Sequence, residues 1–235
     1  EWFQLFQIGF GGIPGRPIGD GPDGHSLWPG FTNVPNEFIE SYYPLRIERY
    51  EMIPDSGGAG LHRGGNGLSV AYRFLCDGEI GIHDDRWLTY PWGVLGGETG
   101  LRSTKKLVRV DGSEEWLPSK IEGVKVKTGD LLYFNTWGGA GWGDPFARDP
   151  ELVRQDVNRG VVSVDGAQRY GVVISKDGSV NSAATTKLRK QLVKQRGDDI
   201  PLFNYGGTID EIKARSLKET HLEPPITPTF QTAKS

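Results

Sequence analysis

The groups in this chain that could carry out chemistry lie in glycine-rich segments. Residues 11–24 contain Arg16, Asp20 and Asp23 among glycines and prolines. Arginine offers a forked donor that suits a carboxylate or phosphate, and glycine lets backbone N–H groups approach such a ligand closely. The same composition also suits a structural turn with a surface arginine, and the segment by itself favours neither.

A second segment, residues 55–67, holds six glycines around Asp55, His62 and Arg63. It is irregular and lies between two predicted strands, so its ordering costs conformational entropy that packing or ligand contacts must offset. Such a segment favours a binding site or a subunit contact. In residues 137–144, four glycines accompany two tryptophans, and backbone packing explains this segment at least as well as ligand binding.

A histidine and two aspartates end the predicted strand at residues 79–83. Because side chains alternate along a strand, His83 and Asp85 share one face and Asp84 lies on the other. A histidine and a carboxylate two residues apart could share a metal ion or act as acid and base. An ordinary pair of an aspartate with Arg86, beside a satisfied histidine, is the favoured alternative while no further ligands are at hand.

Several self-contained enzyme signatures are absent from the sequence. No Gly-Lys-Ser/Thr ends a glycine loop, and no Gly-x-Gly-x-x-Gly follows a predicted strand. The Gly-x-Ser-x-Gly elbow, paired zinc-binding cysteines and His-Glu-x-x-His are also missing. The sequence therefore argues against an independent P-loop ATPase, a dinucleotide-dependent oxidoreductase and a serine hydrolase.

Composition and charge further narrow the functional classes to which the chain can belong. The net charge is −3, and the one basic run, residues 187–196, reads as a solvated helix face, so no nucleic-acid binding is expected. No stretch approaches the roughly 20 apolar residues of a membrane span. Cys76 is the single cysteine, which suits a reducing, cytoplasmic compartment. Residue 1 is Glu and the only methionine is Met52, so we expect a processed chain, a fragment or a subunit whose start is missing.

Short strands and turns are predicted for the first part of the chain. The 34 glycines are about twice the usual share of roughly 7%, which indicates many tight turns. Turns at 76–78 and 110–112 suit hairpins. β-Branched and aromatic residues predict strands over 4–10, 47–53, 68–75, 79–83, 106–110, 124–126 and 130–135.

Helices are predicted towards the end of the chain. Asp149 as N-cap and Pro150 at the first helical position open one that Gly160 ends. A second is expected over 182–196, after a strand at 171–175. Thr208 and Glu211 form a capping box for a third helix, and an extended tail follows from residue 223.

The predicted fold class is α+β. Residues 1–147 are expected to form a β-rich mixed domain with short strands and glycine-rich loops. Residues 148–235 are expected to form a smaller helical α/β region that packs on it, with an extended C-terminal tail. The junction at residues 143–145 reads as a turn, so one compact unit is predicted.

Taken in order, these segments resemble the hydantoinase B/oxoprolinase family. The stretch Gly-Gly-Ile-Pro-Gly-Arg-Pro-Ile-Gly-Asp-Gly-Pro-Asp-Gly at 11–24 is similar to that family's glycine-rich Asp-Gly segment. Residues 35–44 look like the segment that follows it, and residues 55–67 resemble the family's most distinctive stretch. Residues 138–173 look like its C-terminal signature, and the resemblance runs from residue 9 to about residue 190.

The resemblance implies part of an ATP-dependent enzyme that is not active alone. Members pair with a hydantoinase A-type ATPase subunit, which would bind ATP and Mg. ATP activates either a ketone and bicarbonate for carboxylation, or a cyclic amide such as a hydantoin, 5-oxoproline or a lactam for hydrolysis. The sequence of residues 13–26 and 42–44 looks most similar to ketone carboxylases of the acetophenone carboxylase type.

The same resemblance implies which residues line or brace the reaction site. Asp20, Asp55 and His83 are the candidate catalytic residues. The candidate substrate- and anion-binding residues are Gly12, Arg16, Gly58, Arg63 and Gly65. Arginine and backbone N–H groups suit a phosphorylated intermediate because it is anionic.

The chain also departs from the family pattern, because family subunits are more than twice as long. Their His/Asp metal-binding pattern lies in an upstream hydantoinase B half, which is not present in this sequence and is therefore an expected partner. We assign no metal ligand to this chain, and Mn or Zn would belong elsewhere in the complex.

Three functions are compatible with the sequence. The first is an enzyme component whose arginines bind the activated anion. The second is a structural subunit whose glycine loops are docking surface. The third is a stand-alone ligand-binding β module, suggested only by the seven tryptophans.

Overall fold

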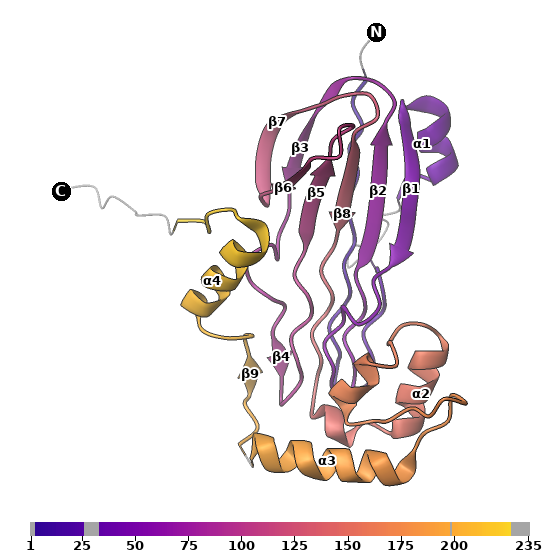
Figure 1. The fold of residues 1–235 in the computed structure, drawn as a ribbon, viewed down its shortest axis with the longest axis vertical. Coiled ribbons are helices and arrows are strands. Elements are labelled where there is room, and N and C mark those ends of the chain that lie inside the picture. The colour runs from indigo at the N-terminus through magenta and orange to yellow at the C-terminus, as the bar shows by residue number, and fades with distance from the viewer. Residues whose placement is uncertain (1–2, 26–32, 198, 227–235) are drawn as a thin grey trace, which may run out of the picture.

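The structure is a computed structural model that describes residues 3–25, 33–197 and 199–226. Antiparallel strands fill one end of an elongated molecule, and extended glycine-rich segments flanked by helices fill the other (Figure 1). The α+β fold class is confirmed. None of the described helices has the length and apolar character needed to cross a membrane.

The larger sheet is antiparallel, with strand order β1-β2-β8-β5-β6. Its strands are β1 (Leu45–Met52), β2 (Leu68–Phe74), β8 (Leu131–Asn135), β5 (Thr104–Val108) and β6 (Glu114–Leu117). A second layer consists of β3 (Gly78–His83) paired with β7 (Lys120–Val126). One core joins the layers, where Leu107 and Leu132 of the sheet meet Ile82 and Val124 of the pair.

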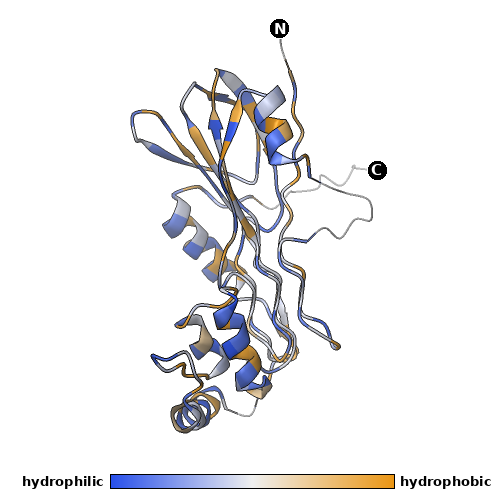
Figure 2. Cartoon of the chain, turned by 90° about the vertical axis from the view of Figure 1, so that its right-hand side faces the viewer, coloured by the Kyte–Doolittle hydropathy of each residue, from blue (hydrophilic) through white to orange (hydrophobic). Residues whose placement is uncertain are grey.

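Alternation of polar and apolar residues explains most of these strands, and Figure 2 shows the two colours interleaved along them. Residues 4–10, predicted as a strand, form none. Gly9 lies against the side chains of Phe134 and Thr136, so this apolar segment covers the face of β8 without pairing at a sheet edge.

Two further local predictions are wrong. The turn at 76–78 makes no hairpin, because β2 pairs with β1 and β8 whereas β3 pairs with β7. Residues 171–175 form no strand: Gly171 ends a 3-10 helix in the left-handed conformation, and only Ile174 forms a bridge, to Val180. The turn at 110–112 does join two paired strands, β5 and β6.

The predicted helices are confirmed at their caps. In α2 (Pro150–Asn158), Asp149 accepts a hydrogen bond from the amide of Glu151. α3 (Ser182–Arg196) is capped by Asn181, and α4 (Ile209–Thr220) has both hydrogen bonds of its capping box. The short α1 (Asn36–Tyr42), which packs beside β1, was not predicted. The remaining elements are β4 (Gly93–Val94), β9 (Phe203–Asn204) and the 3-10 turns η1 (Pro145–Ala147) and η2 (Gly166–Tyr170).

Below the sheets, extended segments from distant parts of the sequence run side by side and form what we call the glycine bundle. It comprises residues 9–15, 21–25, 56–67, 93–101 and 137–143. The segments are joined by backbone hydrogen bonds, as when Gly65 N–H donates to Ile13 O (2.8 Å) and Gly139 N–H donates to Gly65 O (2.8 Å).

Within the bundle, positions where two backbones lie so close that a Cβ would clash recur at every third residue. A Cβ on Gly97 would lie 2.1 Å from Gly141 O, and one on Gly100 would lie 2.1 Å from Gly138 O. Three residues per turn is the repeat of a polyproline-II-type chain, which makes no hydrogen bonds within itself. The bundle therefore satisfies its peptide groups by pairing between segments, and only glycine fits at these contacts.

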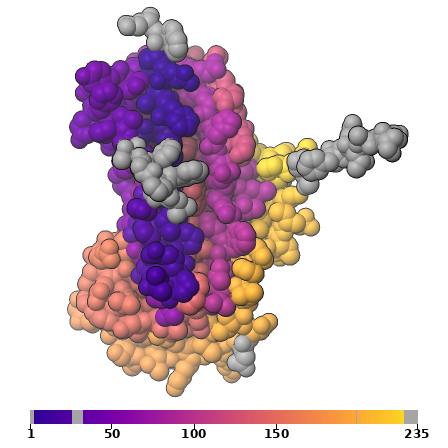
Figure 3. Space-filling view, turned by 180° about the vertical axis from the view of Figure 1, so that it is seen from behind, coloured from indigo at the N-terminus to yellow at the C-terminus, as the bar shows by residue number. Residues whose placement is uncertain are grey.

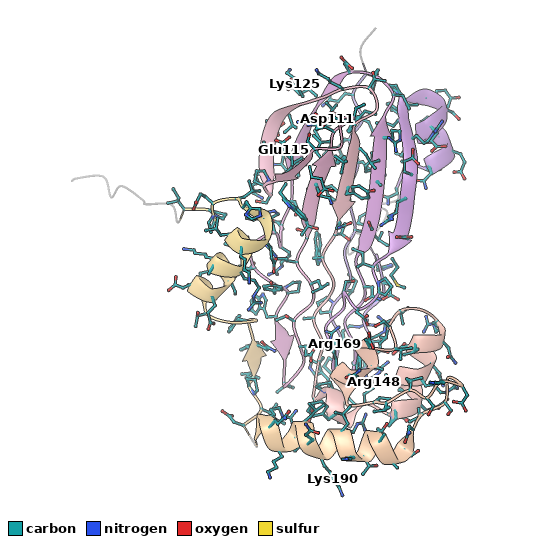
Figure 4. All side chains as sticks on the ribbon, in the orientation of Figure 1. Asp111, Glu115, Lys125, Arg148, Arg169 and Lys190 are labelled. Carbon is teal, nitrogen blue, oxygen red and sulfur yellow. The ribbon has the colours of Figure 1, made fainter. Side chains whose placement is uncertain are left out.

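The helical region packs directly on the bundle. Ala59 of the bundle shares a buried core with Val153, Val162, Tyr170 and Val172. Figure 4 shows Arg148 and Arg169 at this junction, whereas Lys190 on α3 points away from the body. The proposed boundary at residue 147 stays a prediction, and the shared core crosses it.

Candidate functional site

A cleft of about 490 Å³ opens between residues 8–14 and residues 85–91, and we call it the bundle cleft. Trp137 and Gly139 of the glycine bundle also line it. Figure 3 shows the first wall as an indigo column that runs beside the magenta residues of the second. The volume falls within the range of small-molecule sites, which is roughly 300–1,000 Å³.

Three ionisable residues line the bundle cleft: His25, Asp85 and Arg86. The amide of His25 donates to Gly11 O (3.0 Å), which fixes the histidine to the glycine wall. The side chain of Asp85 is 87% exposed, with Lys120 Nζ 3.4 Å from its carboxylate. A guanidinium and an imidazole can hold an anion, and a neighbouring carboxylate can accept a proton.

Arg86 has an unusual backbone. Its φ is 61°, in the left-handed region that residues with a Cβ rarely adopt. Its guanidinium carbon lies 5.9 Å from the centre of the Trp92 ring, in a cation–π contact. Strained residues cluster at functional sites, where the surrounding structure holds them in place.

A second charged centre, the ion network, lies where the glycine bundle meets α2. Arg148 donates to both carboxylate oxygens of Asp20 (2.7 Å each) and to Asp156 (2.7 Å). Arg63 donates to both oxygens of Asp23 (2.7 and 3.0 Å), and its Nε lies 3.6 Å from Asp156. The network links residues that are more than 100 positions apart.

Protonation in the ion network is set by its own members. Burial alone would raise the pKa of Asp20, but the hydrogen bonds and charge of Arg148, with help from the Arg63 amide, hold it below its ordinary value. Burial alone would lower the pKa of Arg148, yet Asp20 and Asp156 raise it. Asp20 and Arg148 therefore stay charged and paired.

Among the predicted site residues, the structure brings Asp20 and Arg63 together. The amide of Arg63 donates to Asp20 (2.9 Å), and Arg16 nearby donates to the carbonyl oxygen of Asp20 (3.3 Å). Arg63 is only 5% exposed and directs its guanidinium at Asp23 and Gly64 O. Its role in anion binding stays a prediction. In this structure its two terminal nitrogens already donate to protein acceptors, whereas its buried Nε has no hydrogen-bond partner among the described residues.

The other two candidate catalytic residues lie elsewhere. Asp55 accepts a hydrogen bond from the amide of Ser163 (3.0 Å) and packs against Gly166, which makes it a bracket between bundle and helical region. His83 is 71% exposed on β3, where its Nε2 lies 2.5 Å from Glu122. Neither residue lines the bundle cleft.

The three candidate glycines are members of the bundle. The N–H groups of Gly12, Gly58 and Gly65 donate to backbone carbonyls at 2.8 Å each. An anion bound at these amides would have to displace a hydrogen bond, so their binding role also stays a prediction. Gly12 is the one of the eight candidates that lines the bundle cleft.

The sequence did not single out His25 or Trp137 as site residues. His25 directly follows the first glycine segment, but its spacing from other residues gave no indication that it lines a cleft. Asp85 was considered with His83 as a possible metal-binding or acid–base pair, and Arg86 only as the ion-pair partner of an aspartate. The expected alternation is confirmed, since Asp84 is 7% exposed whereas His83 and Asp85 are exposed.

No residue of the described part of the chain is assigned to a metal. Within residues 3–25, 33–197 and 199–226, no three His, Cys, Asp or Glu side chains come together as potential ligands.

Comparison with known proteins gives one consistent family. A family model described as Hydantoinase B/oxoprolinase matches residues 1–145, more than half of the chain. The acetophenone carboxylase delta subunit of Aromatoleum aromaticum is 30% identical over 266 aligned positions, which cover 90% of this chain and 39% of that protein. The chain spans between 26% and 39% of the length of four of the curated relatives it matches, and 11% of the 5-oxoprolinase 1 of Arabidopsis thaliana.

Two solved structures share the fold. Nucleotide-free acetone carboxylase matches with a TM-score of 0.67 at 21% identity, over 89% of this chain and 32% of that chain. The ATP-dependent caprolactamase of Pseudomonas jessenii matches with a TM-score of 0.59 at 30% identity, over 77% of this chain and 32% of that chain.

Proposed function

This chain belongs to the hydantoinase B/oxoprolinase family, and we propose that it is part of an ATP-dependent enzyme that carboxylates a ketone through a phosphorylated intermediate. The observation that carries the proposal is the bundle cleft, which places Arg86, His25 and Asp85 against the glycine segment shared with the family. ATP and Mg would be bound by a hydantoinase A-type partner subunit, and an upstream hydantoinase B half would complete the site.

The chemistry assigns a task to each ionisable group of the cleft. Carboxylation beside a carbonyl needs removal of a proton from carbon and stabilisation of the oxygen that becomes negative. Asp85 is exposed and can accept the proton. Arg86, with His25 opposite, can hold the anionic oxygen or phosphoryl group.

The predicted residues outside the cleft would brace it. The ion network of Arg63, Asp20 and Arg148 fastens the glycine segments that form one wall, and Asp55 fastens the bundle to the helical region. Arg16 and His83 are exposed and remain candidates for contact with the partner polypeptides.

Cyclic-amide hydrolysis is the alternative reaction. The caprolactamase supports it through 30% identity and the shared fold. Carboxylation is preferred because the sequence match to the acetophenone carboxylase subunit covers 90% of the chain at 30% identity, whereas the match to the caprolactamase beta subunit covers 63% at 36% identity. In a hydrolase, the same carboxylate would activate water instead of taking a proton from carbon.

A purely structural role is the second candidate function. It is favoured by the glycine bundle and the ion network, whose hydrogen bonds are made within the chain. In that case substitutions in the bundle cleft would leave turnover intact, and substitutions in the bundle would abolish assembly.

The test uses the complex that copurifies with this chain. Labelled bicarbonate incorporation into ketones is measured beside ATP-dependent opening of lactams, hydantoins and 5-oxoproline. Arg86→Asn removes the guanidinium while keeping a residue that tolerates a positive φ. The exposed Arg159→Asn is the matched control.

We expect Arg86→Asn to lower kcat/KM for carboxylation by roughly 10²–10³, as for loss of one transition-state donor, while ATP hydrolysis by the partner persists. Unchanged turnover in this variant would remove the cleft from the mechanism. Ring opening without bicarbonate incorporation would establish the hydrolase instead.

A further inference from the structure

Three buried polar side chains lie behind the loop that carries Arg86. Asp84 is 7% exposed, and Ser103 and Lys105 are completely buried. The carboxylate of Asp84 accepts hydrogen bonds from both Lys105 Nζ and Ser103 Oγ. We call these three residues the buried cluster.

Ser103 of the buried cluster and the backbone of Ser119 together hold residues 84–86 of the loop. Ser103 N–H donates to Arg86 O (2.9 Å), and Ser103 Oγ lies 3.0 Å from Asp85 O. Asp84 N–H donates to Ser119 O (2.8 Å). Three consecutive loop residues are thus fixed from one side, and Asp85 and Arg86 are presented to the bundle cleft on the other.

This loop needs such restraint because of its backbone. Arg86 keeps a φ of 61°, which is unfavourable for an arginine unless the surrounding contacts impose it. If the carbonyl of Arg86 lost its partner on Ser103, the residue would return to an ordinary conformation and its guanidinium would change direction.

Stability alone does not account for the buried ion pair. Lys105 Nζ lies 4.4 Å from the centre of the Phe134 ring, and burial lowers the pKa of Lys105 although Asp84 opposes this shift. A hydrophobic pair of the same volume would commonly be as stable as a buried ion pair. What apolar side chains cannot supply is directional hydrogen bonding to the loop.

We propose that Asp84, Ser103 and Lys105 are positioning residues that hold Arg86 in its left-handed conformation, with its guanidinium facing the bundle cleft. The inference rests on the proposed function only in the claim that Arg86 serves a ligand there. The restraint itself is a property of this chain.

Hydrogen exchange of the isolated chain tests the restraint without a ligand. Asp84→Asn combined with Lys105→Met removes both charges, so that neither charge is left buried without its counter-ion. We expect the amides of Asp84 and Ser103 to exchange at least about tenfold faster, while amides in β1 and β2 keep their protection. Unchanged exchange at the two amides overturns the proposal.

Two further variants serve as a matched control and as a fallback for the hydrogen-exchange experiment. Asp130→Asn with Arg109→Met removes another pair that includes a buried aspartate, and it should leave the exchange of Asp84 and Ser103 unchanged. Ser103→Ala removes one hydroxyl and serves if the double variant does not fold. Global loss of protection in Ser103→Ala as well would make the cluster a plain stability element and refute positioning.

Phosphate titration separates this proposal from the proposed function. If Arg86 acts in the cleft, Arg86→Asn and the Asp84→Asn/Lys105→Met pair each weaken phosphate binding, and their combination adds no further loss. Additive losses would refute positioning through Arg86. If the unmodified chain binds no phosphate, the ligand assignment of the cleft fails, while the exchange result still decides the role of the buried cluster.

Discussion

Arg148 forms a bidentate ion pair with Asp20, in which each terminal nitrogen of the guanidinium donates to one carboxylate oxygen at 2.7 Å. Asp20 belongs to the first glycine segment, and Arg148 follows the turn η1 that leads into the helical region. The same guanidinium also donates to Asp156 in α2 and is 2% exposed. One side chain therefore fastens the cleft-forming segment to the base of the molecule.

Replacing Arg148 should destabilise the fold. Arg148→Met leaves two carboxylates without their main partner, and breaking a buried ion pair in this way costs roughly 3–5 kcal/mol. Urea unfolding followed by tryptophan fluorescence measures the change. Arg154→Met, which breaks an exposed pair with Glu151, is the control and should change the free energy of unfolding far less than Arg148→Met does. Equal costs for the two variants would show that the ion network contributes no more than a surface pair.

The glycine bundle should reject even one methyl group. A Cβ on Gly139 would lie 2.1 Å from Ile13 O, so Gly139→Ala must separate two segments, at a cost of about 3 kcal/mol or more. Gly19→Ala is the control, because no atom lies within 4 Å of its added Cβ. It should change the free energy of unfolding by less than about 1 kcal/mol. A tolerated Gly139→Ala would contradict the close backbone packing.

Acid should unfold the chain partly through Asp20. Its folded pKa lies below the ordinary value of 3.8, so the stabilisation is complete above that value and is lost as the pH falls through the lowered folded pKa. Asp20→Asn should therefore flatten the loss of stability below about pH 4. Melting temperatures between pH 2 and pH 7, with the exposed Asp165→Asn as control, test this. An unchanged slope in Asp20→Asn would exclude Asp20 from the acid transition.

Local signals in the sequence predicted the helices well, and distant contacts explain what they missed. The caps of α2, α3 and α4 are hydrogen bonds between a side chain and a backbone amide two or three residues away, so short motifs suffice. The glycine bundle depends on segments such as 9–15 and 137–143 meeting one another. A glycine-rich segment by itself cannot reveal whether its amides face a ligand or another segment.

The candidate site was predicted only in part, because it too depends on contacts between distant segments. Asp20 and Arg63 do come together, but the partner that organises them, Arg148, lies far along the chain and was not predicted. His25 and Arg86 meet at the cleft only because the bundle sets its walls side by side. No spacing within either segment encodes that meeting.

Arg16 provides a contrast with Arg86. It is exposed in a tight turn closed by two backbone hydrogen bonds between Arg16 and Gly19, and it does not line the cleft. Arg16→Ala should leave phosphate affinity within about twofold and stability within about 0.5 kcal/mol, as for a surface substitution. Calorimetric titration with phosphate measures the affinities of Arg16→Ala and Arg86→Asn in parallel. A larger loss for Arg16→Ala than for Arg86→Asn would move the anion site to the tip of the first glycine segment.

The most direct measurement of the central claim is a titration of isotopically labelled chain with inorganic phosphate, followed by amide and side-chain chemical shifts. The account predicts saturable shifts at Arg86, His25 and Gly139, and their disappearance in Arg86→Asn. Shifts confined to Arg16 or the ion network, or no saturable shifts at the cleft, would contradict it.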